Sequence, residues 1–221
     1  MTTPKLRFDQ PVTLLGGGGI SPKVTRYIGY EPLICADSGA DQALKLGRQP
    51  DAVIGDLDSI SDAARAAFGD VIHEVAEQDS TDFEKCLNAI DAPFIFGFGF
   101  LGRRMDHTIA SLSILSKYHS TPIALVGQGD VTLCLSGEVT IPVKPGSTVG
   151  ILPWPAAVCE SDGLRWELND LDLTLGGQIS SSNEAIKPEI HIKILEGAIL
   201  LTLPARGLDR LPSAFGLSLG S

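Results

Sequence analysis

The first part of the chain repeats one pattern, in which a short apolar segment ends in a polar turn and a helical segment follows. The apolar segments are expected strands. They lie at 12–15, 32–36, 52–54, 71–75 and 94–98. Because strands that alternate with helices form a parallel sheet covered on its faces, the pattern favours a doubly wound α/β domain.

Carboxylates gather where these strands end. Asp37 follows the second strand, Asp56 and Asp58 follow the third, and Asp82 follows the fourth. Ligands of doubly wound sheets bind beyond the carboxyl ends of the strands, so we expect these side chains at one edge. Capping or turn formation explains each aspartate alone. Their coincidence favours a site for a metal ion and a nucleotide.

The pair Asp56 and Asp58 is the centre of this prediction. In extended backbone the two carboxylates project to the same side, and like charges so close are unfavourable unless a cation lies between them. Carboxylate oxygens completed by water and phosphates are typical of Mg²⁺. Taken alone, the motif fits an ordinary Gly/Asp/Ser turn about equally well.

A helix start is predicted at Thr81, because Thr81 and Glu84 have capping-box spacing. Asp82 then lies in the first helical turn, where the helix dipole favours a carboxylate. Lys85, three residues on, shares a face with Asp82. A surface ion pair is the alternative explanation of these two residues.

A second polar turn follows the strand at 94–98 and contains Arg103, Arg104, Asp106 and His107. Arginine binds phosphate through two parallel hydrogen bonds, so this turn is a candidate phosphate site. Helix capping is the alternative for Asp106, and a lone histidine is more often structural than catalytic. The glycines at 16–19 match neither the dinucleotide fingerprint nor the Walker pattern, so they are a weak nucleotide signal.

The chain of 221 residues carries a formal net charge of −10. This acidic balance excludes nucleic acid as the main expected partner and favours a cationic small substrate. The start of the chain is polar, with no signal peptide, and no apolar run reaches the roughly 18 residues of a membrane span. We therefore expect a cytoplasmic protein with no membrane partner.

The cysteines are widely spaced, without a C-x-x-C motif, and lie in apolar surroundings. Buried, reduced thiols are therefore expected rather than disulfides or zinc ligands. They are Cys35, Cys86, Cys134 and Cys159.

After about residue 127 the helical spacing disappears, and short alternating strands follow one another. We expect them at 131–135, 139–143, 148–152, 164–168, 171–175, 189–195 and 198–203, with a hairpin turn at Glu196-Gly197. The sequence thus predicts a Rossmann-like three-layer parallel-sheet domain at 1–136 and an antiparallel β-sandwich domain at 137–207. Residues 208–221 are expected to form a weakly ordered tail.

Several short motifs resemble those of the thiamine pyrophosphokinase family, in order and spacing. They are Ala36-Asp37-Ser38-Gly39-Ala40, the run 50–59, the run 79–85, Gly102–His107, Gly163–Leu168 and Ser181-Ser182-Asn183-Glu184. The resemblance implies an enzyme that converts ATP and thiamine to AMP and thiamine diphosphate with Mg²⁺. It also implies a homodimer, with thiamine bound between the α/β domain of one chain and the sandwich of the other.

The resemblance also implies roles for individual residues. The catalytic set is Asp56, Asp58, Asp82, Lys85, Arg104 and Asp106, of which Asp56, Asp58 and Asp82 hold the metal. The nucleotide side comprises Asp37, Gly39, Arg103 and His107. The thiamine side comprises Gln78, Trp166, Ser182 and Asn183. Either Asp82 or Asp106 takes the proton of the thiamine hydroxyl.

The chain departs from the family pattern at two positions. Ser38 replaces the second residue of an Asp-Gly-Gly-Ala motif and removes the positive-φ freedom of glycine, and Arg103 replaces a glycine. Alternative functions are a pyrophosphokinase for another alcohol, such as a hydroxymethylpterin, a phosphohydrolase with an aspartyl nucleophile, and a non-catalytic sensor of nucleotide or thiamine diphosphate.

Overall fold

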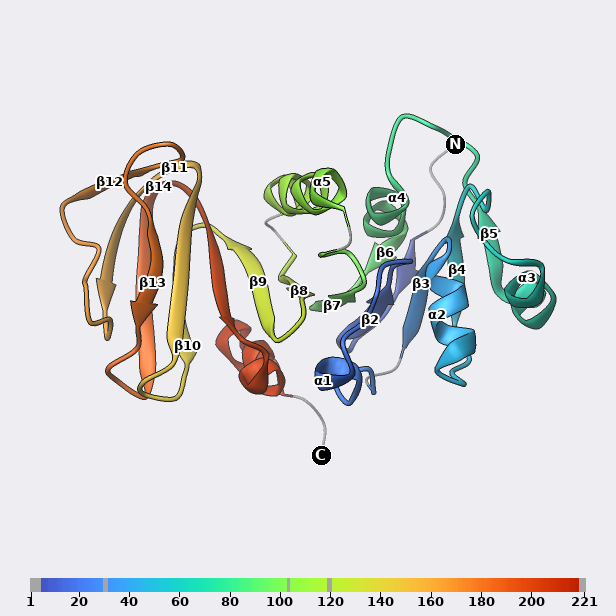
Figure 1. Ribbon diagram of the computed structural model, residues 1–221, viewed down its shortest axis with the longest axis horizontal. Coiled ribbons are helices and arrows are strands. Elements are labelled where there is room, and N and C mark those ends of the chain that lie inside the picture. Colours follow the sequence, from blue (N-terminus) through green and yellow to red (C-terminus); the bar gives the residue numbers. More distant parts are fainter. Residues whose placement is uncertain (1–4, 30–31, 103, 119–120, 219–221) are drawn as a thin grey trace. The chain divides into compact units, whose positions relative to one another are not determined.

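A computed structural model of the chain describes residues 5–29, 32–102, 104–118 and 121–218. The chain forms two compact units. The first comprises 1–114 and 123–128, and the second comprises 115–122 and 129–221. Figure 1 shows the first unit from blue to green and most of the second from yellow to red.

The first unit contains a parallel sheet with strand order β5-β4-β3-β2-β7-β8. Its strands are β2 (Val12–Leu15), β3 (Leu33–Ala36), β4 (Ala52–Gly55), β5 (Ile72–Glu74), β7 (Ile95–Phe98) and β8 (Ile123–Val126). Every residue of these strands is buried except in the edge strand β5. Continuous burial means that both faces of the sheet are covered, as the apolar runs predicted.

The strand order contains a switch point. The chain passes from β2 to β3, β4 and β5 on one side, and returns to place β7 and β8 on the other side of β2. The loops after β2 and β7 therefore leave the sheet in opposite directions, which opens a crevice between them. The predicted parallel α/β fold is confirmed.

Helices connect these strands. They are α1 (Pro22–Thr25), α2 (Gly39–Lys45), α3 (Asp62–Phe68), the 3₁₀ turn η1 (Gly69–Val71), α4 (Asp82–Ala89) and α5 (Met105–Lys117). Helix α2 packs on β2, β3 and α3, and α4 packs on β3 and β4. Short strands β1 (Leu6–Arg7) and β6 (Ile90–Asp91) form a separate parallel pair.

The second unit is antiparallel and is organised by two long strands, β11 (Thr148–Asp162) and β14 (Glu189–Pro204). The start of β11 lies between β13 (Ser180–Glu184) and the end of β14, which pairs in turn with β9 (Asp130–Leu135). The end of β11 lies between β12 (Leu171–Thr174) and the start of β14, which pairs with β10 (Glu138–Pro142). Each long strand therefore pairs with the other and with two short strands. The predicted β-rich second half is confirmed.

The predicted hairpin at Glu196-Gly197 is wrong, because β14 runs through both residues as one strand. The pairing of β11 with β14 shifts register between Pro153 and Ala157, beside Gly197. Gly197 has a φ of +75°, and a Cβ there would overlap the carbonyl oxygen of Ala156. This glycine allows a bulge and a close backbone approach rather than a chain reversal.

The predicted strand at 164–168 is also absent, because a side-chain acceptor within the segment takes two of its backbone hydrogen bonds. The Glu167 carboxylate accepts hydrogen bonds from the backbone N–H groups of Gly163 (3.0 Å) and Leu164 (3.1 Å). Only a single bridge, between Leu164 and Ala185, remains from the expected ladder. The segment is a loop held by its own glutamate.

The predicted division at 136/137 lies inside the second unit, because β9 pairs with β14 and the longer segment of that unit begins at Gly129. The predicted tail is ordered over much of its length. The 3₁₀ helix η2 (Ala205–Phe215) buries Leu208 and Leu211, whose spacing brings both to its packed side. Burial of these leucines opposes the disorder that the glycine and serine content predicted.

All four cysteines are free, as predicted. Burial raises the pKa of Cys35 to about 12 and the pKa of both Cys134 and Cys159 to about 11. These thiols are therefore protonated at neutral pH. No helix in the described ranges has both the length and the apolar character that crossing a bilayer requires.

Candidate active site

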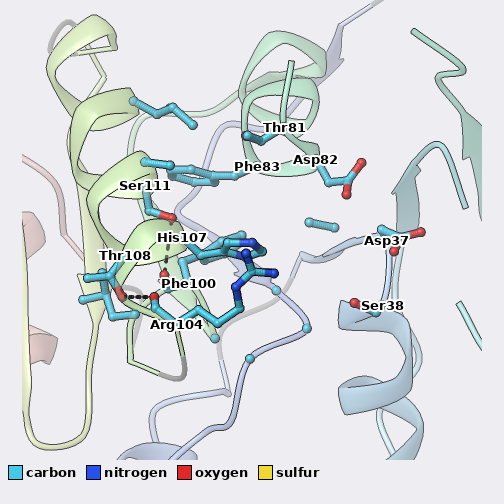
Figure 2. A pocket seen from close by; sticks show the side chains of 18 of the residues that line it. Asp37, Ser38, Thr81, Asp82, Phe83, Phe100, Arg104, His107, Thr108 and Ser111 are labelled. Atoms are coloured by element: carbon cyan, nitrogen blue, oxygen red, sulfur yellow. Dashed lines mark hydrogen bonds between the residues drawn. The ribbon is translucent and has the colours of Figure 1, made fainter. Parts of the chain in front are cut away.

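A cavity of about 650 Å³ lies at the carboxyl ends of the parallel strands, where the strand order switches. Its lining includes the loop after β2, the ends of β3 and β4, the start of α4, the loop after β7 and the start of α5. The loops after β2 and β7 are joined by a hydrogen bond from Gly18 N to Gly99 O (3.0 Å). Figure 2 shows the cavity from close by.

Asp37 lies at the end of β3 and is buried, with only 3% of its surface exposed. Within the part of the chain that the structure describes, its Oδ1 atom has no hydrogen-bond partner. Burial raises the pKa of Asp37, and the nearby carboxylates of Asp82, Asp56 and Asp58 raise it further. An unpartnered buried carboxylate oxygen among other acids is a position where a cation is expected.

Asp56 and Asp58 follow β4 and point one oxygen each toward Asp37. The ligand atoms of these three residues all lie within 4.8 Å of one another. Leu57, between the two aspartates, has a φ of +64° and a buried side chain. A strained turn therefore places the two carboxylates together, and their role in holding a metal stays a prediction.

Lys85 of α4 joins two of the predicted acids. Its ammonium lies 2.7 Å from Oδ2 of Asp56 and 3.0 Å from Oδ1 of Asp82, and only 1% of the side chain is exposed. Burial alone lowers the pKa of Lys85, but the hydrogen bonds to the two carboxylates outweigh it and the pKa is raised. The hydrogen bond from Lys85 in turn lowers the pKa of Asp56. The interaction of Lys85 with Asp82 is therefore part of a buried network and not a surface ion pair.

The start of α4 is capped as predicted, since Thr81 Oγ accepts a hydrogen bond from Glu84 N (3.2 Å). Gln78, ahead of this cap, donates from Nε2 to Oδ2 of Asp56 (3.1 Å). The sequence placed Gln78 on the thiamine side, and the structure brings it to the carboxylate cluster. Its contact with thiamine stays a prediction.

Two helices hold the turn that carries Asp56 and Asp58. Arg65 of α3 donates from Nη2 to the carbonyl oxygen of Leu57 (2.8 Å). Asp41 of α2 accepts from the backbone N–H of Ser61 (3.1 Å) and from its hydroxyl. Sequence reasoning missed Arg65 and Asp41, because their partners lie in another part of the chain or on the backbone. No local motif marks such contacts.

The opposite wall of the cavity comes from the start of α5. All four of Arg104, His107, Asp37 and Asp82 line the cavity, and Figure 2 shows Arg104 and His107 in the centre of the view with Asp37 and Asp82 to their right. Arg104 binds Asp106 through Nε (3.1 Å) and Nη2 (2.5 Å), and this pairing lowers the pKa of Asp106. Arg103, a predicted nucleotide contact, lies outside the described residues.

Backbone constraints explain two residues of the Asp37-Ser38-Gly39-Ala40 motif. Ser38 has a φ of −62°, so this position needs no glycine and the departure from the family pattern causes no strain. A Cβ at Gly39 would overlap the carbonyl oxygen of Leu15, so the close approach of α2 to the end of β2 requires glycine. This packing role is independent of a contact between Gly39 and nucleotide, which stays a prediction.

The remaining thiamine-side residues belong to the second unit. Asn183 is buried, and its amide accepts from Trp166 N (3.2 Å) and donates to Trp166 O (2.6 Å). This pair of bonds fixes the backbone of Trp166, whose ring is 60% exposed. Arg165 lies over that ring at 5.8 Å and binds Glu184 through two nitrogens. Ser182 is exposed on β13.

Fold and site together define a class. A doubly wound sheet whose switch point gathers carboxylates, a buried lysine and an arginine is typical of α/β enzymes that act on phosphate-bearing substrates. A family model described as the thiamin pyrophosphokinase catalytic domain matches residues 29–126, and one described as the thiamin pyrophosphokinase vitamin B1 binding domain matches residues 138–199. The chain belongs to the thiamine pyrophosphokinase family.

Individual relatives agree with the family models. Thiamine pyrophosphokinase 1 of Oryza sativa subsp. japonica is 28% identical over 195 residues, covering 72% of this chain and 74% of the relative. Thiamine pyrophosphokinase of Bacillus subtilis is 26% identical over 206 residues, covering 86% of this chain and 96% of the relative. The crystal structure of thiamin pyrophosphokinase from Geobacillus thermodenitrificans matches with a TM-score of 0.78 at 25% identity. The match covers 88% of this chain and 97% of that protein.

Proposed function

We propose that this protein transfers pyrophosphate from ATP to the hydroxyl of thiamine, giving thiamine diphosphate and AMP. One observation carries the proposal beyond family membership. The carboxylates of Asp37, Asp56 and Asp58 lie within reach of a single cation, and Asp37 and Asp56 line a cavity that Arg104 also lines. That arrangement suits a metal-bound polyphosphate better than a neutral or cationic ligand.

The residues present fit a magnesium ion. All three clustered side chains offer hard oxygen ligands, and the buried Oδ1 of Asp37 has no other partner. The predicted metal set contained Asp82 in place of Asp37, and we now propose Asp37, Asp56 and Asp58 as the holders. When bound, the ion neutralises charge on the phosphate oxygens during transfer.

The hydroxyl oxygen of thiamine forms a bond to the β-phosphorus of ATP, and the bond from that phosphorus to the α–β bridging oxygen breaks, releasing AMP. Positioning and charge neutralisation provide most of the rate enhancement in such reactions. Arg104 is placed to bind phosphate oxygens, and Lys85 holds Asp56 and Asp82 in place. Asp37, Gly39, Arg103 and His107 stay the predicted nucleotide contacts.

The proton of the attacking hydroxyl needs an acceptor, and the two predicted candidates differ. Asp106 is held by two nitrogens of Arg104, and its lowered pKa makes it a weak base. Asp82 uses Oδ1 to bind Lys85, and no described hydrogen bond uses its Oδ2. We therefore assign Asp82 as the acceptor of the hydroxyl proton. Asp106 instead orients Arg104.

On the thiamine side, we propose that Trp166, Ser182 and Asn183 act in a cytoplasmic homodimer, in which the second unit of one chain completes the site of the other. The exposed ring of Trp166 is suited to stack against a cationic heterocycle. Mixing Asp58→Asn with Trp166→Ala protein tests this arrangement. At thiamine concentrations well below the KM of Trp166→Ala, mixed dimers regain activity if each site uses both chains, because one site of each mixed dimer is then intact. A mixture no more active than the average of its two components would exclude the arrangement.

The direct test incubates the protein with Mg-ATP and thiamine and measures AMP and thiamine diphosphate by chromatography. We expect both products in equal amounts, and turnover at least about a hundredfold lower for Asp58→Asn. A hydroxymethylpterin in place of thiamine tests the alternative acceptor. Release of inorganic phosphate without thiamine diphosphate would favour the phosphohydrolase, and binding without any product would favour the sensor.

A further inference from the structure

The second unit contains a cavity of about 450 Å³. Its described lining includes none of the residues proposed for catalysis, nucleotide binding or thiamine binding. Its walls come from β9, the loop between β10 and β11, the end of β14 and η2. Val131, Leu203 and Leu211 form a buried apolar floor, and prolines 142 and 145 lie beside it. The volume is within the range of small-molecule sites.

The charges around this cavity have one sign. Lys144, Arg206 and Arg210 line it, and among the described residues no aspartate or glutamate does. Within the ranges that the structure describes, none of these cations forms an ion pair, whereas Arg7, Lys85, Arg104, Arg165, Lys187 and Lys193 each do. In a chain with a net charge of −10, an unneutralised cationic rim on an apolar cavity is complementary to an anion.

One of the cations is held in position. Arg206 donates from Nη2 to the hydroxyl of Ser147 (2.9 Å), and Ser147 is only 4% exposed. The backbone N–H of Ser147 donates to the carbonyl oxygen of Lys144 (3.0 Å), so the same turn carries the second cation. A guanidinium fixed in this way loses less freedom on binding a ligand, and its other nitrogens remain available for bidentate contact.

We propose that this cavity binds an organic anion with an apolar body, namely an aryl or alkyl carboxylate or phosphate monoester. The apolar body contacts the floor of Val131, Leu203 and Leu211. The anionic group lies between Arg206, Arg210 and Lys144. This site is separate from the residues proposed for the reaction, so a failure of the proposed reaction would not count against the anion site.

The probe is 8-anilinonaphthalene-1-sulfonate, an aryl anion whose fluorescence rises on burial. Its Kd is measured for the full chain, for Arg206→Met/Arg210→Met, and for Lys23→Met/Lys45→Met, which removes the same charge from exposed positions on α1 and α2. We expect a Kd at least about tenfold weaker in the arginine variant and unchanged in the lysine variant. Equal affinity in all three proteins would overturn the proposal.

A second variant tests the apolar part. No described atom lies within 4 Å of the position where a Cβ at Gly207 would be, so Gly207→Trp starts from open space and adds a large ring to the lining of the cavity. We expect this variant to bind the probe too weakly to measure, while its thermal unfolding midpoint equals that of the parent. Retained binding would contradict the site.

Competitors identify the anion. 1-Naphthoate and 1-naphthyl phosphate are each titrated against the bound probe, with neutral 1-naphthylmethanol as the control. Displacement by one of the anions alone assigns carboxylate or phosphate as the ligand group, and displacement by both supports the shared site. Displacement by neither anion, or by the neutral compound equally well, would show that the cationic rim selects nothing.

Discussion

Arg65 on helix α3 donates a hydrogen bond of 2.8 Å to the carbonyl oxygen of Leu57, the residue between Asp56 and Asp58. Leu57 has a φ of +64°, an unfavourable conformation for a residue with a side chain. The arginine therefore stabilises the conformation in which both neighbouring carboxylates face Asp37. Arg65 is a positioning residue and does not line the cavity.

Replacing Arg65 should loosen this turn without removing a ligand. For Arg65→Met we expect a rise of about tenfold in the Mg²⁺ concentration that gives half-maximal activity, because small displacements of aligned groups have large kinetic effects. Arg65→Lys, which keeps a donor, should restore part of this loss. The KM for thiamine should not change. A fall in kcat with an unaltered Mg²⁺ requirement would contradict the positioning role.

Asp37 and Asp58 should respond differently to the same change. Asp37→Asn removes a buried charge whose Oδ1 has no partner, so the metal-free protein should gain stability, with a melting temperature about 2–4 °C higher. Asp58→Asn changes an exposed side chain and should leave the melting temperature within about 1 °C. Calorimetry in chelator checks both, and both variants should lose activity. A lower melting temperature for Asp37→Asn would show that its carboxylate stabilises the fold.

Trp166 offers a test of the thiamine side. Trp166→Ala should raise the KM for thiamine about tenfold and leave the KM for ATP unchanged, because an aromatic face is lost from a cation but no phosphate contact is removed. Trp166→Phe keeps an aromatic ring and should lie close to the parent. Steady-state kinetics with each substrate varied in turn provides the measurement. An unchanged KM for thiamine in Trp166→Ala would remove this residue from the site.

The cysteines should be unreactive in the folded protein. Burial raises the pKa of Cys35 to about 12, so at pH 8 its thiol is protonated and enclosed, and iodoacetamide should modify it only after unfolding. The raised pKa of Cys35 also determines how the stability of the fold depends on pH. The folded state holds the proton more tightly than the unfolded state, so stability is unaffected below pH 9 and falls as the pH rises from about 9 toward 12. Mass spectrometry of native and unfolded samples tests the reactivity, and rapid native labelling of Cys35 at pH 8 would contradict its burial.

Local chemistry was sufficient to predict much of the first unit. The apolar runs and the aspartates after them are adjacent along the chain, so their spacing predicts the strands, the doubly wound fold class and the cap at Thr81. In the second unit, spacing was a poorer guide. Gly197 has the same turn propensity in a hairpin as in a bulge, and only the pairing of β14 with β11 distinguishes the two.

The sequence alone therefore determined the fold class and the acidic motifs, because propensity, hydrophobic spacing and order along the chain express these properties, and the resemblance of its short motifs indicated the family. Tertiary structure decided which acids meet. Asp37 joins Asp56 and Asp58 while Lys85 binds Asp56 and Asp82, and Arg65 and Asp41 hold the turn from two different helices. Such contacts join residues that lie far apart in the chain or bind backbone atoms, and their geometry exists only when the strands and helices pack together.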